Sequence, residues 1–492
     1  MPTAGLSASD REFFAGVADV VYGNLYSPKR AELIVRLAPG AKLGDLTAHP
    51  NPLEQAVQAR LAPLLAGGGA ALARLSEADR TVVEPALLYV CFHRYVSQLD
   101  ALIERQLKQS GTPVSVPFGD EAIGELVRNG FSEERAVRYF SFIFHLRRAF
   151  SFIHGSLPGS SESMRRLREA LWNNVVTHDM RGYQTALWNR MEDFSTLLLG
   201  ETGTGKGSAA SAIGRAGFIP YLPAERRFAA NFADAFIAIN LSQFSEALIE
   251  SELFGHVKGA FTGAIGNHAG LFERCNEHGA LFLDEIGEVS APVQIKLLQV
   301  LQDRVFTPVG GHERKRFSGR VVAATNRSLG ALRRAGQFRD DFFYRLCSDV
   351  IEMPTLRQRI AEAPGELEQL VRLLVRRIAG TEDTTLADGV MEALETSVPP
   401  GYAWPGNVRE LEQAVRRILL TGRYAGDLFE APRSQEEALL EQLRAGELSA
   451  TQLLEQYCAL LYRRFGTYAE VAKHAGLDPR TTRKYIEGAK PK

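Results

Sequence analysis

Apolar side chains recur at helical spacing through the first third of the chain. In residues 85–111 the spacing alternates between four and three, which places the apolar positions on one stripe of a helix. The N-terminal third shows no alternation of short buried strands with helices, and this argues against a phosphoacceptor receiver domain. We therefore predict a mainly helical N-terminal region over residues 1–155. The stripe consists of Leu88, Phe92, Tyr95, Leu99 and Leu102.

Aromatic residues are concentrated at the end of this region. A packed helical core or a dimer seam would account for them, because aromatic rings bury large apolar areas. A ligand pocket or a partner surface is the alternative interpretation. The residues concerned are Phe131, Tyr139, Phe140, Phe142, Phe144, Phe150 and Phe152.

The pattern changes after "HGSLPGSSES" at residues 154–163. The runs "STLLL", "AFIAI", "ALFLD" and "RVVAAT" are short, apolar and bounded by turn or polar residues, as in buried parallel strands. After about residue 355 the pattern is helical again, and 380–389 and 421–435 are predicted connections. We predict a multidomain protein with an α/β domain over 156–425, helical after about 355, and a small helical unit over 435–492.

Composition and charge narrow the class of protein. The apolar fraction is 45% and the charged fraction 23%, which is ordinary for globular proteins. The net charge of −1 means that any nucleic-acid site must be local. Four scattered cysteines indicate a reducing compartment. We find no signal-peptide pattern and no apolar run of roughly 18 residues, so we expect a cytoplasmic protein without a membrane partner.

A glycine-rich loop follows the first predicted strand of the α/β domain. It has the spacing of a P-loop, in which backbone N–H groups surround phosphates and the lysine reaches the β- and γ-phosphates. Glycine-rich loops are common, but the preceding strand and the full spacing favour phosphate binding. Gly207 stands where a Ser or Thr hydroxyl usually binds Mg²⁺. The loop comprises Gly200, Glu201, Thr202, Gly203, Thr204, Gly205, Lys206 and Gly207.

Polar residues end two further strands. Asp284 and Glu285 follow "ALFL", and adjacent carboxylates there are costly unless a cation or a substrate uses them. In a P-loop enzyme Asp284 holds Mg²⁺ and Glu285 polarises the attacking water, although the pair alone could be a helix N-cap. Asn326 could orient that water. Arg409 lies in the first turn of a helix, where a cation is disfavoured, so we expect an anionic partner such as a nucleotide phosphate.

Several of these motifs are found together in one family. From about residue 157 to 421 the chain resembles the AAA+ domain of NtrC-like sigma-54-dependent transcriptional activators, the bacterial enhancer-binding proteins. The shared motifs, in order, are "GSSESM", "GETGTGKG", "ESELFGHVKGAFTGA", "ALFLDEIGE", "AATN", "FRDDFFYRL" and "WPGNVREL". Gly207 departs from the family, where Glu is usual. The segments 177–193 and 214–234 are also longer than expected, which predicts a subfamily-specific surface.

The resemblance implies roles for further residues. Asn240 would relay the nucleotide state to Glu285, and Arg409 would be the sensor II arginine. Arg339 and Arg345 would act as arginine fingers across a hexamer interface. The "GAFTGA" loop would touch sigma-54 with an exposed Phe-Thr tip, whereas a Phe that merely plugs the core is the alternative. That loop comprises Gly259, Ala260, Phe261, Thr262, Gly263 and Ala264.

The C-terminal segment has a helix-turn-helix pattern. "SATQLLEQYCALLYRRF" is amphipathic, and "TYAEVAKHAGLDPRTTRKYI" predicts a helix, a turn at 475–477 and a second helix from Pro479. Residues 461–492 hold eight Lys and Arg against three Asp and Glu. This favours DNA binding over a solvated basic tail, and the segment resembles the Fis-type unit that ends this family. The predicted DNA contacts are Arg480, Thr481, Thr482, Arg483 and Lys484.

These expectations combine into one functional hypothesis. The resemblance implies an activator that hydrolyses ATP with Mg²⁺ in a ring of its own subunits, binds enhancer DNA and remodels sigma-54 RNA polymerase. The N-terminal region would gate it in response to an unknown effector. One alternative is a DNA-binding repressor with a degenerate ATPase, which the intact Lys206, Asp284 and Glu285 disfavour. The other is an AAA+ remodelling ATPase with a different target, which the "GAFTGA" loop and the C-terminal unit disfavour.

Overall fold

The protein is described by a computed structural model that covers most of the chain. The described residues are 5–40, 51–66, 70–380, 384–399, 401–424 and 448–488, with Leu439 and Leu443. Contacts group Met1–Ala393 with Pro399–Gly422, and Leu394–Val398 with Arg423–Lys492. The predicted boundary at 425–435 lies outside the described residues. None of the described helices combines the length and the apolar character that a membrane crossing needs.

The N-terminal region is helical, as predicted. Ser76 and Ser132 cap two of its helices by accepting the N–H groups of Asp79 and Arg135. Four residues of the predicted apolar stripe are buried, with Leu99 and Leu102 fully enclosed, whereas Phe92 is half-buried. The helices are α1 (Ala8–Tyr22), α2 (Pro28–Leu37), α3 (Pro52–Ala66), α4 (Glu77–Lys108), α5 (Gly119–Arg128) and α6 (Glu133–Ser156), with the short turn η2 (Ala71–Arg74).

A five-stranded parallel sheet forms the centre of the α/β domain, with the order β4-β5-β8-β1-β9. In a parallel sheet all carboxyl ends meet at one edge, and ligands bind there. The P-loop follows β1, the acid pair ends β5 and Asn326 follows β8, so all three lie at this edge. The strands are β1 (Thr196–Leu199), β4 (Phe236–Asn240), β5 (Ala280–Asp284), β8 (Arg320–Thr325) and β9 (Asp349–Glu352).

Helices cover both faces of the sheet, and alternate residues of β8 belong to different cores. Val322 and Ala324 pack with α7 (Glu162–Val176) and α9 (Lys206–Arg215), whereas Val321 and Ala323 pack on the opposite face. Burial on both faces explains why the strands are continuously apolar. The opposite face is covered by α10 (Glu246–Phe254), α12 (Ala291–Asp303) and α14 (Asp340–Leu346).

Short elements connect these layers. They are α8 (Met180–Gly182), η3 (Tyr183–Leu187), η4 (Met191–Asp193), β2 (Tyr221–Leu222), η5 (Pro223–Glu225), β3 (Arg227–Phe228), η6 (Phe232–Asp234), η7 (Leu241–Gln243), α11 (Leu271–Arg274), η8 (Ile286–Glu288), β6 (Val305–Phe306), β7 (Lys315–Arg316) and α13 (Leu329–Arg334).

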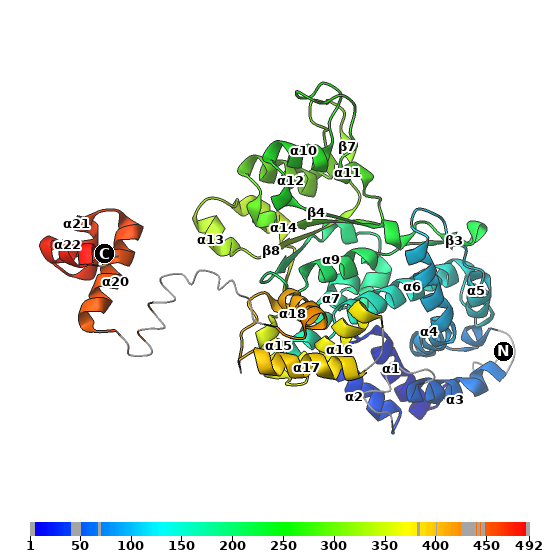
Figure 1. Ribbon diagram of the computed structural model, residues 1–492. Coiled ribbons are helices and arrows are strands. Elements are labelled where there is room, and N and C mark those ends of the chain that lie inside the picture. The colour runs from blue at the N-terminus through cyan, green and yellow to red at the C-terminus, as the bar shows by residue number, and fades with distance from the viewer. Residues whose placement is uncertain are drawn as a thin grey trace. The chain divides into compact units, whose positions relative to one another are not determined.

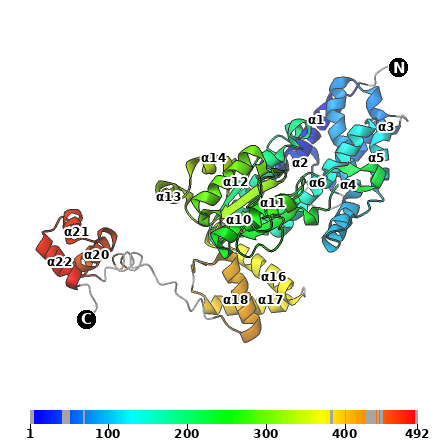
Figure 2. The same ribbon diagram turned by 90° about the horizontal axis from the view of Figure 1, so that it is seen from above.

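The chain after β9 is helical, as predicted, and α16 and α18 lie together beside the sheet domain (Figure 2). A buried ion pair at 2.7 Å joins Arg359 to Glu366, and Glu366 also accepts the N–H groups of Ser160 and Ser161. The linker before α7 is thereby fixed to these helices. The elements are α15 (Leu356–Glu362), α16 (Glu366–Ala379), α17 (Thr384–Ser397) and α18 (Asn407–Thr421).

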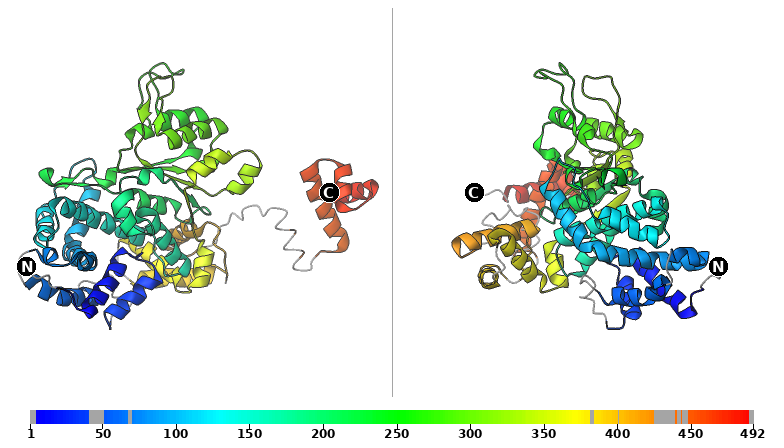
Figure 3. Two further views of the ribbon diagram at one scale, coloured as in Figure 1. Left: turned by 180° about the vertical axis from the view of Figure 1, so that it is seen from behind. Right: turned by 90° about the vertical axis from the view of Figure 1, so that its right-hand side faces the viewer.

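The N-terminal helices share one hydrophobic core with the α/β domain. That core runs from Phe14 in α1 to Val322 in the central sheet. Figure 1 shows α6 beside the P-loop helix α9, and in both views of Figure 3 the blue and cyan helices lie against the rest of this unit. The two regions that we distinguished by sequence pattern therefore pack as one compact unit.

The two lengthened segments, 177–193 and 214–234, both contribute side chains to this shared core. Tyr221 and Phe228 of the β2–β3 hairpin pack against Phe140 of α6, with ring centroids 5.0 and 6.0 Å apart. In the other segment, the hydroxyl of Tyr183 lies 3.0 Å from Nε2 of His145. Burial lowers the pKa of His145 to about 3, so the imidazole is neutral. The expectation of a surface is therefore wrong for these parts, because their aromatic side chains are buried against α6.

In the second unit, the described residues from 450 to 488 form three helices around a small core. Gly476, with a φ of 67°, ends α21 in the left-handed conformation that glycine tolerates. The core consists of Cys458, Leu461, Val471 and Ile486. The helices are α20 (Ala450–Phe465), α21 (Tyr468–Ala475) and α22 (Pro479–Gly488).

Candidate functional site

A cavity of about 940 Å³ lies at the carboxyl edge of the sheet. Its walls are the P-loop, the ends of β4 and β5, the linker around Leu157 and the helices α16 and α18. The structure thus brings together residues that are far apart in the sequence. The predicted residues that line this cavity are Thr202, Gly203, Thr204, Gly205, Lys206, Gly207, Asn240, Asp284, Glu285 and Arg409.

The P-loop has the backbone that its glycines allow. Gly203 and Gly205 have φ values of 80° and 98°, and a Cβ on Gly203 would lie 2.1 Å from the carbonyl oxygen of Gly406. Nζ of Lys206 donates to the carbonyl oxygens of Gly200 and Glu201 at 2.7 and 3.1 Å. Burial lowers the pKa of Lys206, and the nearby carboxylates of Glu285 and Asp284 oppose this shift. The loop therefore holds a cation in a partly dehydrated position.

The acid pair ends β5 in a strained turn. Glu285 has a φ of 57°, and its N–H donates to Oδ1 of Asp284 at 3.1 Å. Strain of this kind is concentrated at functional sites. Oε2 of Glu285 is buried and has no hydrogen-bond partner among the described residues. A buried carboxylate oxygen without a partner is the group that a water molecule or a cation would satisfy.

Asn240 lies beside the acid pair but does not bond to it. The register of β4 and β5 pairs Asn240 with Asp284. Its Oδ1 accepts the N–H and the hydroxyl of Ser242 at 3.0 and 2.7 Å. No hydrogen bond joins Asn240 to Glu285 within the described chain, so the relay stays a prediction.

Asn326 contacts the P-loop from the adjacent strand. Its Nδ2 donates to Oγ1 of Thr202 at 3.0 Å. Asn326 lines a neighbouring cavity of about 530 Å³ together with Gly200 and Glu201, and not the cavity that contains Lys206. The structure thus places Asn326 beside the P-loop but outside the lining of the cavity that contains Lys206, and its role toward water stays a prediction.

The two predicted arginine fingers lie outside the cavity of their own chain. Arg339 forms an ion pair with Asp341 at 2.7 Å and is 43% exposed. Arg345 instead donates from Nε and Nη2 to the carbonyl oxygen of Leu301 at 2.8 and 2.6 Å, near the end of α12. Arg339 is therefore accessible to a neighbouring molecule, whereas Arg345 has a structural bond within its own chain.

Sequence analysis missed the connection between the P-loop and the helices after β9. Glu201 accepts from the guanidinium of Arg357 at 2.5 and 3.0 Å and from Nδ2 of Asn407 at 3.1 Å. The same Nδ2 donates to the carbonyl oxygen of Thr202, and Oδ1 of Asn407 accepts the N–H of Leu356. Asn407 has a φ of 53°, and its place after Pro-Gly was the available signal. Asn407 therefore couples the P-loop to α15 and α18.

The "GAFTGA" loop is exposed at its tip. The N–H of Gly259 donates to the carbonyl oxygen of Ala264 at 2.9 Å, which closes the loop at its base. Phe261 is 43% exposed, with its ring edge-on to His256, and Thr262 is exposed. The structure therefore excludes a Phe261 buried as a core plug. It also buries Ala264, which leaves this residue out of any contact surface.

A neighbouring segment is hydrogen-bonded to the base of the "GAFTGA" loop. The N–H of Val257 donates to the carbonyl oxygen of Val309, and the N–H of Val309 donates to that of Gly255. The segment between β6 and β7 therefore supports the segment between α10 and α11, and both project from one end of the domain (Figure 1).

The C-terminal residues predicted to contact DNA are not equally accessible. Arg480, Arg483 and Lys484 are exposed on α22, although Arg483 pairs with Glu487 at 2.8 Å. Thr481 is partly buried, and its hydroxyl donates to Asp478. Thr482 is fully buried and donates to the carbonyl oxygen of Asp478. The structure therefore removes Thr482 from the predicted contact set.

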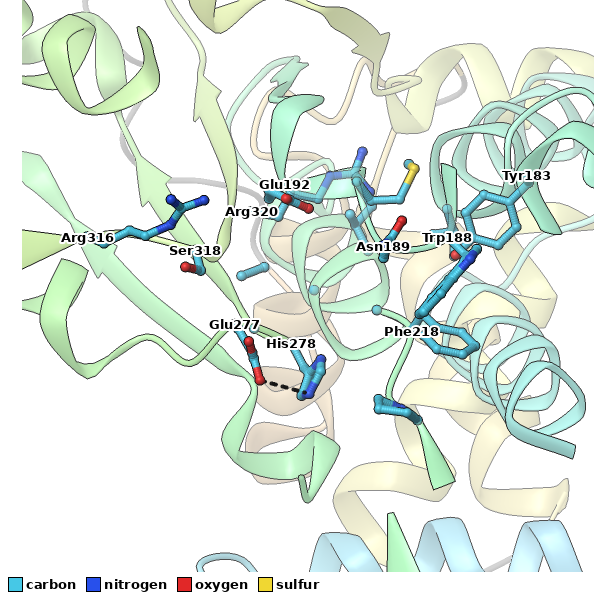
Figure 4. A pocket seen from close by; sticks show the side chains of 18 residues that line it. Tyr183, Trp188, Asn189, Glu192, Phe218, Glu277, His278, Arg316, Ser318 and Arg320 are labelled. Carbon is cyan, nitrogen blue, oxygen red and sulfur yellow. Dashed lines mark ion pairs between the residues drawn. The ribbon is translucent and has the colours of Figure 1, made fainter. Parts of the chain in front are cut away.

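A separate cavity of about 350 Å³ lies at the opposite edge of the sheet (Figure 4). Tyr183, Trp188 and Phe218 form one side, and the pair of Glu277 and His278 lies across from them with 3.5 Å between Oε1 and Nε2. β5 and β8 begin at this cavity, so it is far from the carboxyl ends where the P-loop lies. It does not belong to the candidate active site.

Comparison with known proteins identifies part of the chain. Residues 178–352 match the family model of the sigma-54 interaction domain. The chain is 39% identical over 264 residues to the Nif-specific regulatory protein of Klebsiella pneumoniae, which is 53% of this chain and 43% of that protein. It is 41% identical over 229 residues to the Sigma54-dependent transcriptional activator SfnR of Pseudomonas putida, covering 46% and 57%.

A third relative supports the same assignment. The DNA-binding transcriptional regulator NtrC of Azospirillum brasilense is 42% identical over 228 residues, covering 46% of this chain and 43% of that protein. In each case the match spans between two-fifths and three-fifths of the relative's length. Residues 178–352 are therefore similar to the sigma-54 interaction domain, and one of the relatives is named as a sigma-54-dependent transcriptional activator.

Proposed function

We propose that the protein is a sigma-54-dependent transcription activator that hydrolyses ATP in an oligomeric ring and uses it to remodel sigma-54 RNA polymerase in the cytoplasm. The observation that carries this proposal is the cavity at the carboxyl edge of the sheet. It unites Lys206, the acid pair and Arg409 in a domain that also presents an exposed "GAFTGA" tip.

We propose separate tasks for the cavity residues. The N–H groups of the P-loop and Lys206 bind and orient the phosphates, and Arg409 adds a further cation at the same cavity. The unpartnered Oε2 of Glu285 is suited to accept a hydrogen bond from the attacking water. Phosphoryl transfer to water depends mainly on this positioning and on charge stabilisation.

The residues present fit a magnesium ion with few protein ligands. Mg²⁺ is usually held by one or two carboxylates, phosphate oxygens and water. Asp284 supplies the carboxylate, and Gly207 supplies no side-chain oxygen. When bound, Mg²⁺ would neutralise negative charge on the phosphates. The chain itself would then hold the ion through Asp284.

The loop at residues 259–263 is the proposed contact with sigma-54. We expect Thr262→Ala to leave ATP hydrolysis and ring assembly near wild type, because Thr262 is exposed and distant from the cavity walls. The same variant should lose promoter opening, measured as open-complex formation at a sigma-54 promoter. Binding of sigma-54 in the presence of an ATP transition-state analogue should be lost with it.

A matched control tests whether this effect is specific to the tip. Lys258→Ala changes an exposed residue just outside the loop and should open promoters normally. Phe261→Ala should behave like Thr262→Ala. If both tip variants open promoters as well as Lys258→Ala does, the loop is not the contact and the proposed function is wrong.

The C-terminal helices are the proposed enhancer-binding unit, with α22 as the recognition helix of a helix-turn-helix. Arg480→Ala and Lys484→Ala should each weaken DNA binding. For every phosphate that a variant leaves unneutralised, the salt slope of the binding constant should fall by about 0.9. Arg464→Ala removes one positive charge from α20 and serves as the control. Slopes for Arg480→Ala and Lys484→Ala that equal the slope for Arg464→Ala would contradict this assignment.

The N-terminal region is proposed to regulate the ATPase through α6. Arg148, which is fully buried, donates from Nη1 and Nη2 to the carbonyl oxygens of Arg215 and Gly217 at 2.8 and 2.7 Å. These carbonyls lie at the C-terminal end of α9, whose N-terminal end carries Lys206. A cation there complements the helix dipole and fixes the position of the helix.

Removing the two hydrogen bonds of Arg148 should weaken nucleotide binding at the other end of α9. Arg148→Met should weaken ATP binding by about two- to fivefold, which corresponds to the contribution of about 0.5–1 kcal/mol expected for a cation at a helix end. Arg135 lies on the same helix as Arg148, and Arg135→Met, which breaks its ion pair with Glu84 of α4, is the control. Titration with a fluorescent ATP analogue measures both. Equal affinities for the two variants would exclude a link through Arg148.

A further inference from the structure

A further cavity lies where the N-terminal helices meet the α/β domain. This junction cavity has a volume of about 320 Å³ and is lined from one side by α1, α2, α4 and α6. Trp172 of α7, Met180 of α8 and Gln184 of η3 form the other side. Its walls therefore come from both regions that share the first hydrophobic core.

Aromatic rings dominate the walls of the junction cavity. Small-molecule sites are typically clefts or cavities of about 300–1,000 Å³ lined by apolar and aromatic side chains, and the junction cavity has this size and lining. An apolar cavity of about 150 Å³ already accepts benzene, and about twice that volume accommodates a two-ring molecule. The rings at the wall include Tyr26, Tyr89, Phe92, Tyr139, Phe150 and Trp172.

One polar group at the wall lacks a partner. The hydroxyl oxygen of Tyr26 is buried and forms no hydrogen bond within the described part of the chain. An unsatisfied buried hydroxyl costs about 1–3 kcal/mol. Burial also raises the pKa of Tyr26, so its hydroxyl stays protonated and can donate. An acceptor oxygen on a bound molecule would satisfy it.

The charges around the junction cavity select against cations. Among the described residues that line it, none is Asp or Glu, whereas Arg30 and Arg147 both belong to its walls. Arg147 is engaged by Asp100 at 2.6 Å, and Nε of Arg30 donates to the carbonyl oxygen of Val20. Burial lowers the pKa of His154, which therefore contributes a neutral ring stacked on Phe150. Burying a cation without an opposite charge is costly.

We infer that the junction cavity binds a small planar aromatic molecule with an acidic oxygen, and that this molecule is the input of the N-terminal region. The second statement rests on the proposed function. α6 supplies the link, because Tyr139 and Phe150 face the cavity while Arg148 on the same helix holds the end of α9. A molecule that shifts α6 would shift the P-loop helix through this bond.

Calorimetric titration of the full chain with defined probes tests the binding site. 2-Naphthoate and indole-3-carboxylate should bind one molecule per chain. They should bind at least about tenfold more tightly than decahydro-2-naphthoate, which is not planar, and 2-naphthylmethylammonium, which is a cation. If neither aromatic carboxylate binds, or if the two control compounds bind equally well, the inference is wrong.

Variants locate the binding in the protein. Tyr26→Phe removes only the hydroxyl and should weaken 2-naphthoate binding by about two- to tenfold. Leu146→Trp fills the cavity and should abolish binding, with circular dichroism as the check on folding. Tyr22→Phe, on α1 but outside the lining, should bind as wild type does. Unchanged affinity in Tyr26→Phe, or in folded Leu146→Trp, would place the probe elsewhere.

A separate measurement tests whether the bound molecule regulates the ATPase. ATP turnover of wild-type protein should change when 2-naphthoate is added, and the change should be absent in Leu146→Trp. Binding without any change in turnover would overturn the input role alone and leave the binding site intact. Neither measurement uses sigma-54 or DNA, so failure here is distinguishable from failure of the proposed activator function.

Discussion

Lys206→Ala should abolish ATP binding, whereas Glu285→Gln should bind ATP and fail to hydrolyse it. Lys206 supplies the ammonium within the P-loop, and alanine leaves the phosphates without it. Glutamine keeps the size of Glu285 but cannot take a proton from water. General-base groups contribute about 10²- to 10⁴-fold, so turnover should fall by that factor. Calorimetric ATP titration and a phosphate-release assay measure the two quantities.

The two variants separate binding from chemistry only if the fold survives. Glu285 has a φ of 57°, a conformation that glutamine tolerates about as well as glutamate, so its unfolding temperature should remain near wild type. Hydrolysis by Glu285→Gln at the wild-type rate would show that another group activates the water. ATP binding by Lys206→Ala at the wild-type affinity would remove the P-loop assignment.

Arg339→Ala should reduce ATP turnover by about a thousandfold or more while ATP binding persists, because arginine fingers contribute about 10³- to 10⁵-fold in other NTPases. Arg339 is exposed and does not line the cavity of its own chain, so any contact with bound ATP must come from a neighbouring subunit. A phosphate-release assay on assembled rings measures the loss.

Mixing experiments test the action between subunits. Rings that combine Arg339→Ala with Lys206→Ala chains contain some sites with an intact Lys206 and an intact neighbouring Arg339, so partial activity should return. Verified mixed rings without recovery would contradict action in trans. Arg345→Ala is a less direct test, because it also removes the bonds to the carbonyl oxygen of Leu301 and should lower the unfolding temperature.

The packing of the N-terminal helices changes how their role can be examined. Deletion of residues 1–155 would expose the rings of Phe218, Tyr221 and Phe228, which pack against α6. A truncated protein would therefore lose part of its core together with any regulation. Point variants separate these effects better, because the N-terminal helices stay in place. Arg148→Met removes the two hydrogen bonds to the end of α9, and Tyr26→Phe removes one unpartnered hydroxyl.

Local sequence patterns were sufficient to predict the helices and strands and the phosphate-binding chemistry of the P-loop. The spacing from Gly200 to Lys206 defines a P-loop because its glycines must adopt backbone angles that other residues rarely adopt. The apolar run before Asp284 predicts a buried strand by the same kind of local reasoning. The tip of the "GAFTGA" loop was predicted to be exposed for its flanking glycines, and the structure leaves Phe261 and Thr262 exposed.

Which side chains meet was decided only by the tertiary structure. Nothing local in the sequence pairs Glu201 with Arg357 and Asn407, since more than 150 residues separate them. Thr482 has a polar side chain of the kind that contacts DNA, but the packing of the helices buries this side chain in the core. The lengthened segments contain aromatic residues whose partners lie on α6, and a surface prediction failed because burial depends on the whole fold.

The sequence by itself therefore determined the order of elements, the P-loop chemistry and the resemblance to a family, because these depend on neighbours along the chain. The tertiary structure decided that the N-terminal helices share a core with the α/β domain, that Arg148 holds the P-loop helix and that a junction cavity lies between them. These features depend on contacts between residues distant in sequence. The apolar periodicity of one segment predicts which of its faces is buried, but not which other segment packs against that face.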